Sequence, residues 1–208
     1  MADPAYRIAR DDGSPSGYTR PRDWAPMTDE EWEDLSGYLR LSGPGRKVRD
    51  VRARFDAFFW VARSGRPWHE LPIGYGRPDT VHRHFRRLAH DGLFLRLLKA
   101  LAHPFAPPGL CALEHWICRA YRLAGKIAGE GAAIRLARRL GFLSALRGWT
   151  TLMPDPDLSE IYVDMALRVV RHPDFDPWNM PDRLLDHLGR LICFTGGRMR
   201  ITKHMAPP

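Results

Sequence analysis

Apolar residues recur at helical steps of three and four along most of the chain after residue 27. Residues 27–39, about 47–64 and 93–101 each carry one such stripe, and a capping box of Thr28 and Glu31 opens the first. This spacing predicts amphipathic helices that each turn one face toward a core. The first helix is acidic on its outer face, so it is not expected to contact phosphate.

The second half of the chain has the same periodicity. Helices are predicted over residues ~111–128, ~131–147, ~158–171 and ~181–194. Sustained alternation with a period of two is absent from the sequence, and only Leu191–Phe194 and Met199–Thr202 are short candidates for extended structure. We therefore predict an all-α fold, in which a helix-turn-helix N-terminal module is followed by a second, mostly helical region.

Prolines and glycines divide the chain into segments. Residues 1–26 are polar and rich in proline and glycine, which predicts a flexible arm. Prolines at 104, 107 and 108 predict a linker near residues 105–110. The predicted units are therefore an arm (1–26), an N-terminal domain (27–103), a helical domain of unknown role (110–195) and a tail (196–208).

The segment Arg77–Leu88 combines one apolar edge with a very basic face. On a helical wheel, Val81, Phe85 and Leu88 share the apolar edge. The opposite side carries Asp79, Arg83, Arg86 and Arg87, with Thr80 and His82 on the flanks. A short segment, Pro67–Pro72, and a glycine-bounded turn precede it. This order is typical of a helix-turn-helix DNA reader, although a solvated basic face on a small helical domain would have the same pattern.

Charge supports an anionic partner. The chain has 208 residues, a net charge of +8 and a pI near 9.9. Residues 45–104 carry thirteen Arg and Lys against five Asp and Glu, a local surplus of +8. Duplex DNA is the first candidate, and an anionic membrane surface is the second. A second basic amphipathic helix, about 132–146, would suit a membrane surface, a partner helix or simple packing.

Individual roles follow from donor geometry. Arg83 suits the two acceptors of a guanine edge, whereas Arg86 and Arg87 are better placed for phosphate. Asp79 could accept a hydrogen bond from a cytosine amino group or favour the helix N-terminus. The predicted DNA-binding set is Arg77, Asp79, Thr80, His82, Arg83, Arg86 and Arg87, with backbone contacts from Arg49 and Arg52 on the preceding helix.

Other chemistry has weaker signals. Three cysteines cannot form a disulfide framework, so we expect a reducing, cytoplasmic location. The predicted DNA binding adds the expectation that the protein is nucleoid-associated. Cys111, His115 and Cys118 would share one helical face, but zinc normally draws its ligands from a loop or from two elements. We therefore predict no metal and no cofactor. We also predict no membrane segment, because apolar runs of about 20 residues are absent from the sequence.

Residues 27–101 resemble the N-terminal domain of small bacterial insertion-sequence transposases of the DDE superfamily, in the branch typified by insertion sequence five. The matching features are Met27–Trp32, Arg52–Gly65, Pro67-Trp68, Leu71-Pro72, Tyr75-Gly76, Thr80-Val81, Arg83 and Phe85–Arg87. The resemblance implies a DNA-binding module in which Thr80, Arg83, Arg86 and Arg87 lie on the reading helix, supported by Trp68, Tyr75 and Phe85. Pro78, His82 and Leu88 depart from the family pattern.

The catalytic half of such transposases is not evident in the sequence. That half has alternating strands and three carboxylates that hold two metal ions, whereas the acids after residue 150 lie among prolines and helical patterns. We therefore predict a non-catalytic DNA-binding protein derived from a transposase, with a second copy or a separate transposase subunit as further candidate partners. The alternatives are a helical protein-interaction or structural protein, and a decayed or split DNA-binding subunit that needs a separate nuclease.

Overall fold

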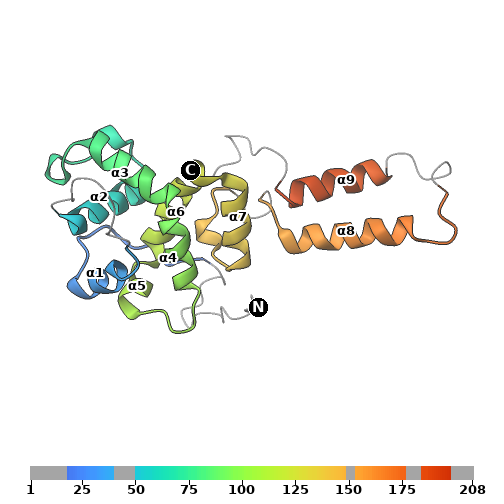
Figure 1. Ribbon diagram of the computed structural model, residues 1–208, viewed down its shortest axis with the longest axis horizontal. Helices are drawn as coiled ribbons and strands as arrows, with labels where there is room; N and C mark the ends of the chain where they lie inside the picture. The colour runs from blue at the N-terminus through green and yellow to red at the C-terminus, as the bar shows by residue number, and fades with distance from the viewer. Residues whose placement is uncertain (1–17, 40–49, 149–152, 177–183, 198–208) are drawn as a thin grey trace.

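Helices account for all the regular secondary structure in the part of the chain that the computed structural model describes, residues 18–39, 50–148, 153–176 and 184–197. They are α1 (Asp29–Ser36), α2 (Val51–Ser64), α3 (Pro78–His90), α4 (Leu93–Leu101), α5 (Pro108–Ala112), α6 (Glu114–Ala128), α7 (Glu130–Arg139), α8 (Pro156–Val170) and α9 (Leu184–Thr195). Helices α1–α7 form a body, and α8 and α9 project from it side by side (Figure 1). The predicted all-α class is confirmed for these residues.

Helix α6 lies at the centre of the body (Figure 1). It packs against α2, α3, α4 and α7, and eight of its fifteen residues are buried. One continuous cluster of buried apolar side chains runs from Met27 to Met153. The N-terminal module therefore shares its core with α5–α7, and the predicted boundary at residues 105–110 overlaps the start of α5, whose Leu110 belongs to this core.

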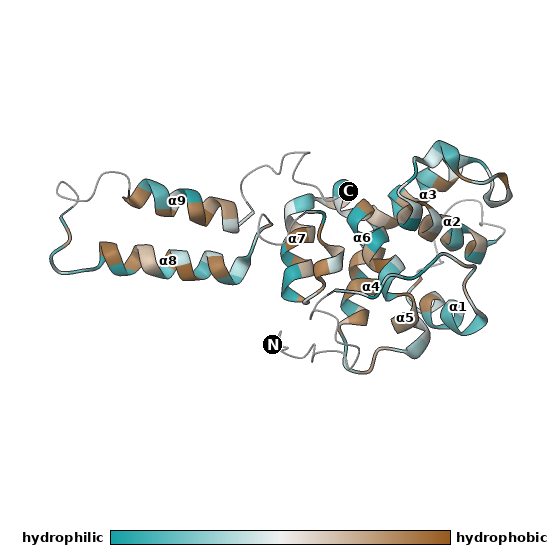
Figure 2. Ribbon diagram, turned by 180° about the vertical axis from the view of Figure 1, so that it is seen from behind, coloured by the Kyte–Doolittle hydropathy of each residue, from teal (hydrophilic) through white to brown (hydrophobic). Residues whose placement is uncertain are grey.

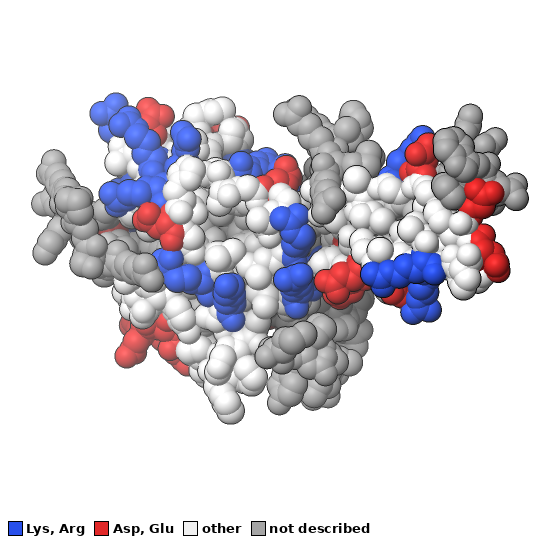
Figure 3. Space-filling view, turned by 45° about the vertical axis from the view of Figure 1, so that its right-hand side comes forward, with Lys and Arg blue, Asp and Glu red and all other residues white. Residues whose placement is uncertain are grey.

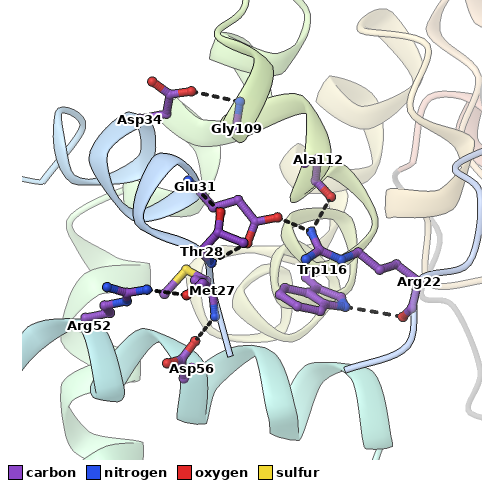
Figure 4. Close-up of polar contacts among 10 residues, drawn as sticks. All are labelled: Arg22, Met27, Thr28, Glu31, Asp34, Arg52, Asp56, Gly109, Ala112 and Trp116. Carbon is purple, nitrogen blue, oxygen red and sulfur yellow. Dashed lines mark hydrogen bonds and ion pairs between the residues drawn. The ribbon is translucent and has the colours of Figure 1, made fainter. Parts of the chain in front are cut away.

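The residues just before α1 pack on the body. Residues 18–26 lie within the region predicted as a flexible arm, but Arg22 covers the ring of Trp116 with its guanidinium carbon 4.1 Å from the ring centroid. The same guanidinium donates to Glu31 at 2.5 Å and to the carbonyl of Ala112 at 2.9 Å (Figure 4). A cation–π contact and two charge-assisted hydrogen bonds hold Arg22 against the body.

Helix α1 is anchored at both ends. The predicted capping box is present, since the side chain of Thr28 accepts from the backbone of Glu31 and the carboxylate of Glu31 accepts from the backbone of Thr28. The Asp34 carboxylate accepts from the backbone N–H of Gly109 at 2.8 Å, which joins α1 to α5 (Figure 4). A Cβ atom at position 109 would lie 2.7 Å from that carboxylate, so only glycine permits this approach.

Several predicted boundaries differ from the structure. Helix α2 begins at Val51, not near residue 47, because the side chain of Asp50 caps it by accepting from the backbone of Ala53. Helix α7 ends at Arg139 rather than near residue 147, since Gly141 adopts a left-handed φ of 72° and Phe142 turns into the core. Leu191–Phe194, a candidate for extended structure, is helical in α9; Met199–Thr202 lies outside the described residues.

The α8–α9 hairpin joins the body at one end only. Asp155 caps α8, receives the guanidinium of Arg138 at 3.0 Å, and donates its backbone N–H to the carbonyl of Thr195 at 2.7 Å. The guanidinium of Arg135 donates to the carbonyl of Gly196 at 3.1 Å. From this joint the two helices extend away from the body, and apolar residues lie along both (Figure 2). None of the described helices has the length and apolar character needed to cross a bilayer.

Candidate nucleic-acid interface

Helix α3 carries most of the predicted DNA-binding residues. Pro78 occupies its first turn, where a missing N–H costs nothing, and Gly76 turns the chain into it with a φ of 92°. Val81, Phe85 and Ala89 are buried, as the apolar edge on the helical wheel predicted for the first two. Leu88 is half-buried at the margin of this edge. The opposite face of the helix is consequently turned outward.

An aromatic cluster holds α3 in position. The ring of Phe85 lies 5.3 Å from that of Phe58 on α2 and 4.7 Å from that of Phe94 on α4. Trp68, on the 3₁₀ helix Trp68–Glu70, lies 5.2 Å from Phe85 and stacks at 4.9 Å on the imidazole of His82. Packed aromatic rings of this kind stabilise a single orientation. The short segment before α3 therefore supports the helix from one side.

The outward face of α3 is polar and mostly basic. Its exposed residues are Asp79, Thr80, Arg83, Arg86, Arg87 and His90, and Arg77 is exposed immediately before the helix. Lys and Arg side chains gather at the end of the body that carries α3, at the upper left of Figure 3. Within the described part of the chain, the guanidinium groups of Arg83, Arg86 and Arg87 make no ion pair or hydrogen bond with protein.

Several arginines elsewhere in the body donate hydrogen bonds to other parts of the protein. The side chain of Arg63 donates to Asp23 at 2.8 Å, that of Arg122 to the Ser144 carbonyl at 2.7 Å, and that of Arg147 to Glu130. These contacts stabilise the body and use the donors that a phosphate would need. The three arginines of α3 differ from them because their donors remain available to an external anion.

The two residues predicted on the preceding helix are placed differently. Arg49 lies outside the described residues. Arg52 donates to the carboxylate of Asp29 at 2.5 Å and also to the carbonyl of Met27 (Figure 4). Its guanidinium thus joins the first turn of α2 to the start of α1. Sequence periodicity could not reveal this contact, because the partners are more than twenty positions apart.

His82 and His84 contribute little positive charge to α3 near neutral pH. Burial lowers the pKa of His82, and the neighbouring Arg86 lowers it further while Asp79 opposes them. Burial also lowers the pKa of His84 to about 4, with smaller contributions from Arg87 and Arg54. His82 is therefore an uncharged stacking partner for Trp68, and the arginines provide the positive charge of α3.

One exposed residue beside α3 is not among the predicted DNA-binding residues. Ile73 belongs to the second 3₁₀ helix, Ile73–Tyr75, and its side chain is 95% exposed. An apolar side chain at the turn leading into a reading helix is suited to contact with a thymine methyl group. Its only sequence signal is an aliphatic residue placed between a proline and a glycine.

The cysteine and histidine pattern of the second half is not assembled for metal binding. His115 and Cys118 are buried, whereas Cys111 is exposed. His115 is hydrogen-bonded through Nδ1 to the hydroxyl of Thr19 at 3.1 Å. Across the described ranges, no group of three or more His, Cys, Asp or Glu residues is placed to hold a metal ion.

Comparison with known proteins supports the resemblance of the N-terminal region. Residues 27–98 match the family described as "Putative transposase of IS4/5 family (DUF4096)". A protein of Sinorhizobium fredii (strain NBRC 101917 / NGR234), described as "Uncharacterized protein y4sN", is 31% identical over 78 residues, which cover 36% of this chain and 62% of that protein. No solved structure matches the chain. The match confirms that residues 27–98, which contain α1–α3 and most of α4, are similar to a transposase-type domain.

Proposed function

We propose that this protein binds duplex DNA through the outward face of α3 and does not itself cut DNA. The observation that carries the proposal is the state of the α3 arginines. Arg83, Arg86 and Arg87 are exposed, make no ion pair or hydrogen bond with the described residues, and lie on a helix held by buried aromatic rings. An unneutralised row of guanidinium groups on a rigid helix has the geometry that a major groove accepts.

The domain match supports the same function. The matched residues 27–98 include all of α3 and the short helices before it. Duplex DNA is then the partner, and the nucleoid is the expected location. The non-catalytic part of the proposal rests on the acids of the C-terminal region. Asp157, Glu160 and Asp164 are exposed on one helix, α8, rather than gathered on neighbouring strands.

Binding to duplex DNA of mixed sequence over a range of salt concentrations tests the proposal. Contact with about 4–6 phosphates predicts that log K falls with log salt with a slope of about −4 to −5. Replacing Arg83, Arg86 and Arg87 together by alanine is expected to reduce that slope to about −2 and to weaken binding at least tenfold. Absence of binding by the unaltered protein at low salt would refute DNA binding.

A charge-matched variant separates a specific surface from net charge. Lys99, Lys126 and Arg139 are exposed on α4, α6 and α7, so their replacement by alanine removes the same three charges and leaves the α8–α9 hairpin unchanged. We expect this variant to bind DNA within about twofold of the unaltered protein, since phosphate contacts act locally at physiological salt. Equal losses in the two variants would show that α3 is not the interface. Cleavage of the DNA on addition of Mg²⁺ would contradict the non-catalytic part.

A further inference from the structure

Helix α8 is apolar on most of its circumference but is hardly buried. Only Pro156 of its fifteen residues is buried. Six large apolar side chains on it are between 36% and 55% exposed: Leu158, Ile161, Val163, Met165, Leu167 and Val170. A helix with so broad an apolar surface normally buries most of it in a core. The hairpin therefore lacks a covering element within the described part of the chain.

The exposed residues form two strips, one on each side of the line where α8 meets α9. Leu158, Ile161 and Met165 form one strip. Val163, Leu167 and Val170 form the other, at steps of four and three, and we call it the aliphatic strip. Helical geometry places Leu185 of α9, which is 41% exposed, on the same side of the hairpin as the aliphatic strip.

The charges on α8 are arranged unevenly along its length. Its acids, Asp157, Glu160 and Asp164, lie in the first nine residues, whereas Arg168 and then Arg171 come at its end. Two α8 helices that pack antiparallel bring the acidic half of each beside the basic half of the other. An external polyanion or an anionic membrane would instead meet three carboxylates, which makes it a poor occupant.

We propose that the α8–α9 hairpin is a dimerisation element, in which the aliphatic strip packs against the same strip of a second copy of this chain. The two-fold axis passes near Leu167, so that Val163 of one copy lies against Val170 of the other. Two antiparallel hairpins then form a four-helix bundle, the usual way in which such hairpins bury their apolar faces. This inference goes beyond DNA binding and does not depend on it.

The same geometry predicts a particular ion pair. Glu160 and Arg171 border the aliphatic strip on its outer edge and are both exposed. With the axis near Leu167, Glu160 of one copy lies within about 3 Å, measured along the helix, of Arg171 of the other. Within one copy these residues are about 16 Å apart along the helix, too far for contact. An effect that couples the two residues therefore has to arise between copies.

Sedimentation equilibrium of the full chain, without DNA, tests the dimer. The expected species is twice the 23.8 kDa mass of the chain. Leu167→Glu is expected to weaken the dimer at least 100-fold, because it places two carboxylates together at the axis. Ile161→Glu, the same kind of change on the other strip, is expected to weaken it less than threefold. A monomer at every concentration overturns the proposal, and a loss confined to Ile161→Glu overturns the choice of strip.

Charge reversal distinguishes pairing between copies from a general loss of helix stability. Glu160→Arg and Arg171→Glu are each expected to weaken the dimer about threefold to tenfold. The double variant is expected to restore most of that loss, although both changes oppose the dipole of α8. Circular dichroism of each variant checks that the helices persist. If the double variant is weaker than both single variants, the antiparallel pairing is wrong.

The dimer proposal and the proposed function can be tested separately. Dimer formation is measured without DNA, and DNA binding is measured with variants of α3 whose hairpin is unchanged. A monomer that binds DNA through α3 overturns only the dimer, and a dimer that fails to bind DNA overturns only the proposed function. If both hold, the two-fold axis predicts binding sites made of two inverted half-sites.

Discussion

Helices α6 and α8 have the same length, fifteen residues, but very different surroundings. Eight residues of α6 are buried, against one of α8, although α8 contains as many apolar residues as α6. Helix α6 is covered by α2, α3, α4 and α7, whereas α8 is covered along its length by α9 alone. Apolar content therefore does not distinguish a core helix from an interaction helix; the number of neighbours does.

Matched truncations give the largest expected difference between these two helices. Ile117 on α6 is 0% exposed, and Ile161 on α8 is 55% exposed. Ile117→Ala is expected to lower the free energy of unfolding by about 2–5 kcal/mol, because it leaves a cavity in a packed core. Ile161→Ala is expected to cost less than about 1 kcal/mol. Urea unfolding of both variants checks this, and equal costs would mean that α8 is as well covered as α6.

Acid is expected to destabilise the body through its buried histidines. Burial lowers the pKa of His115 to about 4, with smaller contributions from Arg119, Arg63 and Arg122. Between pH 6.5 and about 4 the unfolded chain takes up a proton that the folded chain does not, so stability falls as the pH falls. The full loss from His115 is on the order of 3 kcal/mol.

Urea unfolding of the full chain at pH 7, 6 and 5 measures that dependence. His84 contributes in the same direction, because burial lowers its pKa to about 4 as well. His115→Gln is expected to lower stability at pH 7 but to reduce its dependence on pH. An unchanged dependence on pH in this variant would show that His115 has the same pKa in the folded protein as in the unfolded chain.

Two glycine-to-alanine substitutions, one in the body and one in the α8–α9 hairpin, are expected to change stability in opposite directions. A Cβ atom on Gly109 would lie 2.7 Å from the Asp34 carboxylate and 2.8 Å from the Glu30 carbonyl, so Gly109→Ala has to separate α5 from α1. We expect a loss of about 1–3 kcal/mol. Gly189 on α9 has nothing within 4 Å of such an atom, and Gly189→Ala is expected to gain about 0.5–1 kcal/mol. Thermal unfolding compares them, and a loss at both positions would contradict the open space at 189.

Much of the body could be predicted because its signals are local. The capping box of Thr28, the stripe of α4 and the buried edge of α3 each depend on residues within one or two turns. The end of α7 was missed for a different reason. Phe142 continues the helical apolar pattern in sequence, but the left-handed Gly141 redirects it into the core after Arg139.

The sequence was sufficient to predict the outward face of the candidate interface, but not the hydrogen bonds that other arginines make within the body. Helical spacing alone places Arg83, Arg86 and Arg87 opposite Val81 and Phe85. The hydrogen bonds of Arg22 and Arg52 within the protein were not predictable, because their partners are distant in sequence. The hydrophobic pattern around a surface arginine is the same whether its side chain is hydrogen-bonded or free. Exposure of the aliphatic strip was unpredictable for a related reason, since its spacing is equally typical of a core helix.

The smallest expected effect on stability distinguishes an arginine that stabilises the fold from one that binds DNA. Arg52→Ala removes hydrogen bonds to Asp29 and to the Met27 carbonyl, and is expected to cost about 0.5–1.5 kcal/mol of stability, because one partner is exposed. Its affinity for DNA is expected to change less than threefold. Arg83→Ala is expected to behave in the opposite way, with unchanged stability and weaker DNA binding. A large loss of affinity in Arg52→Ala at full stability would place this guanidinium in the interface and extend that surface from α3 to α2.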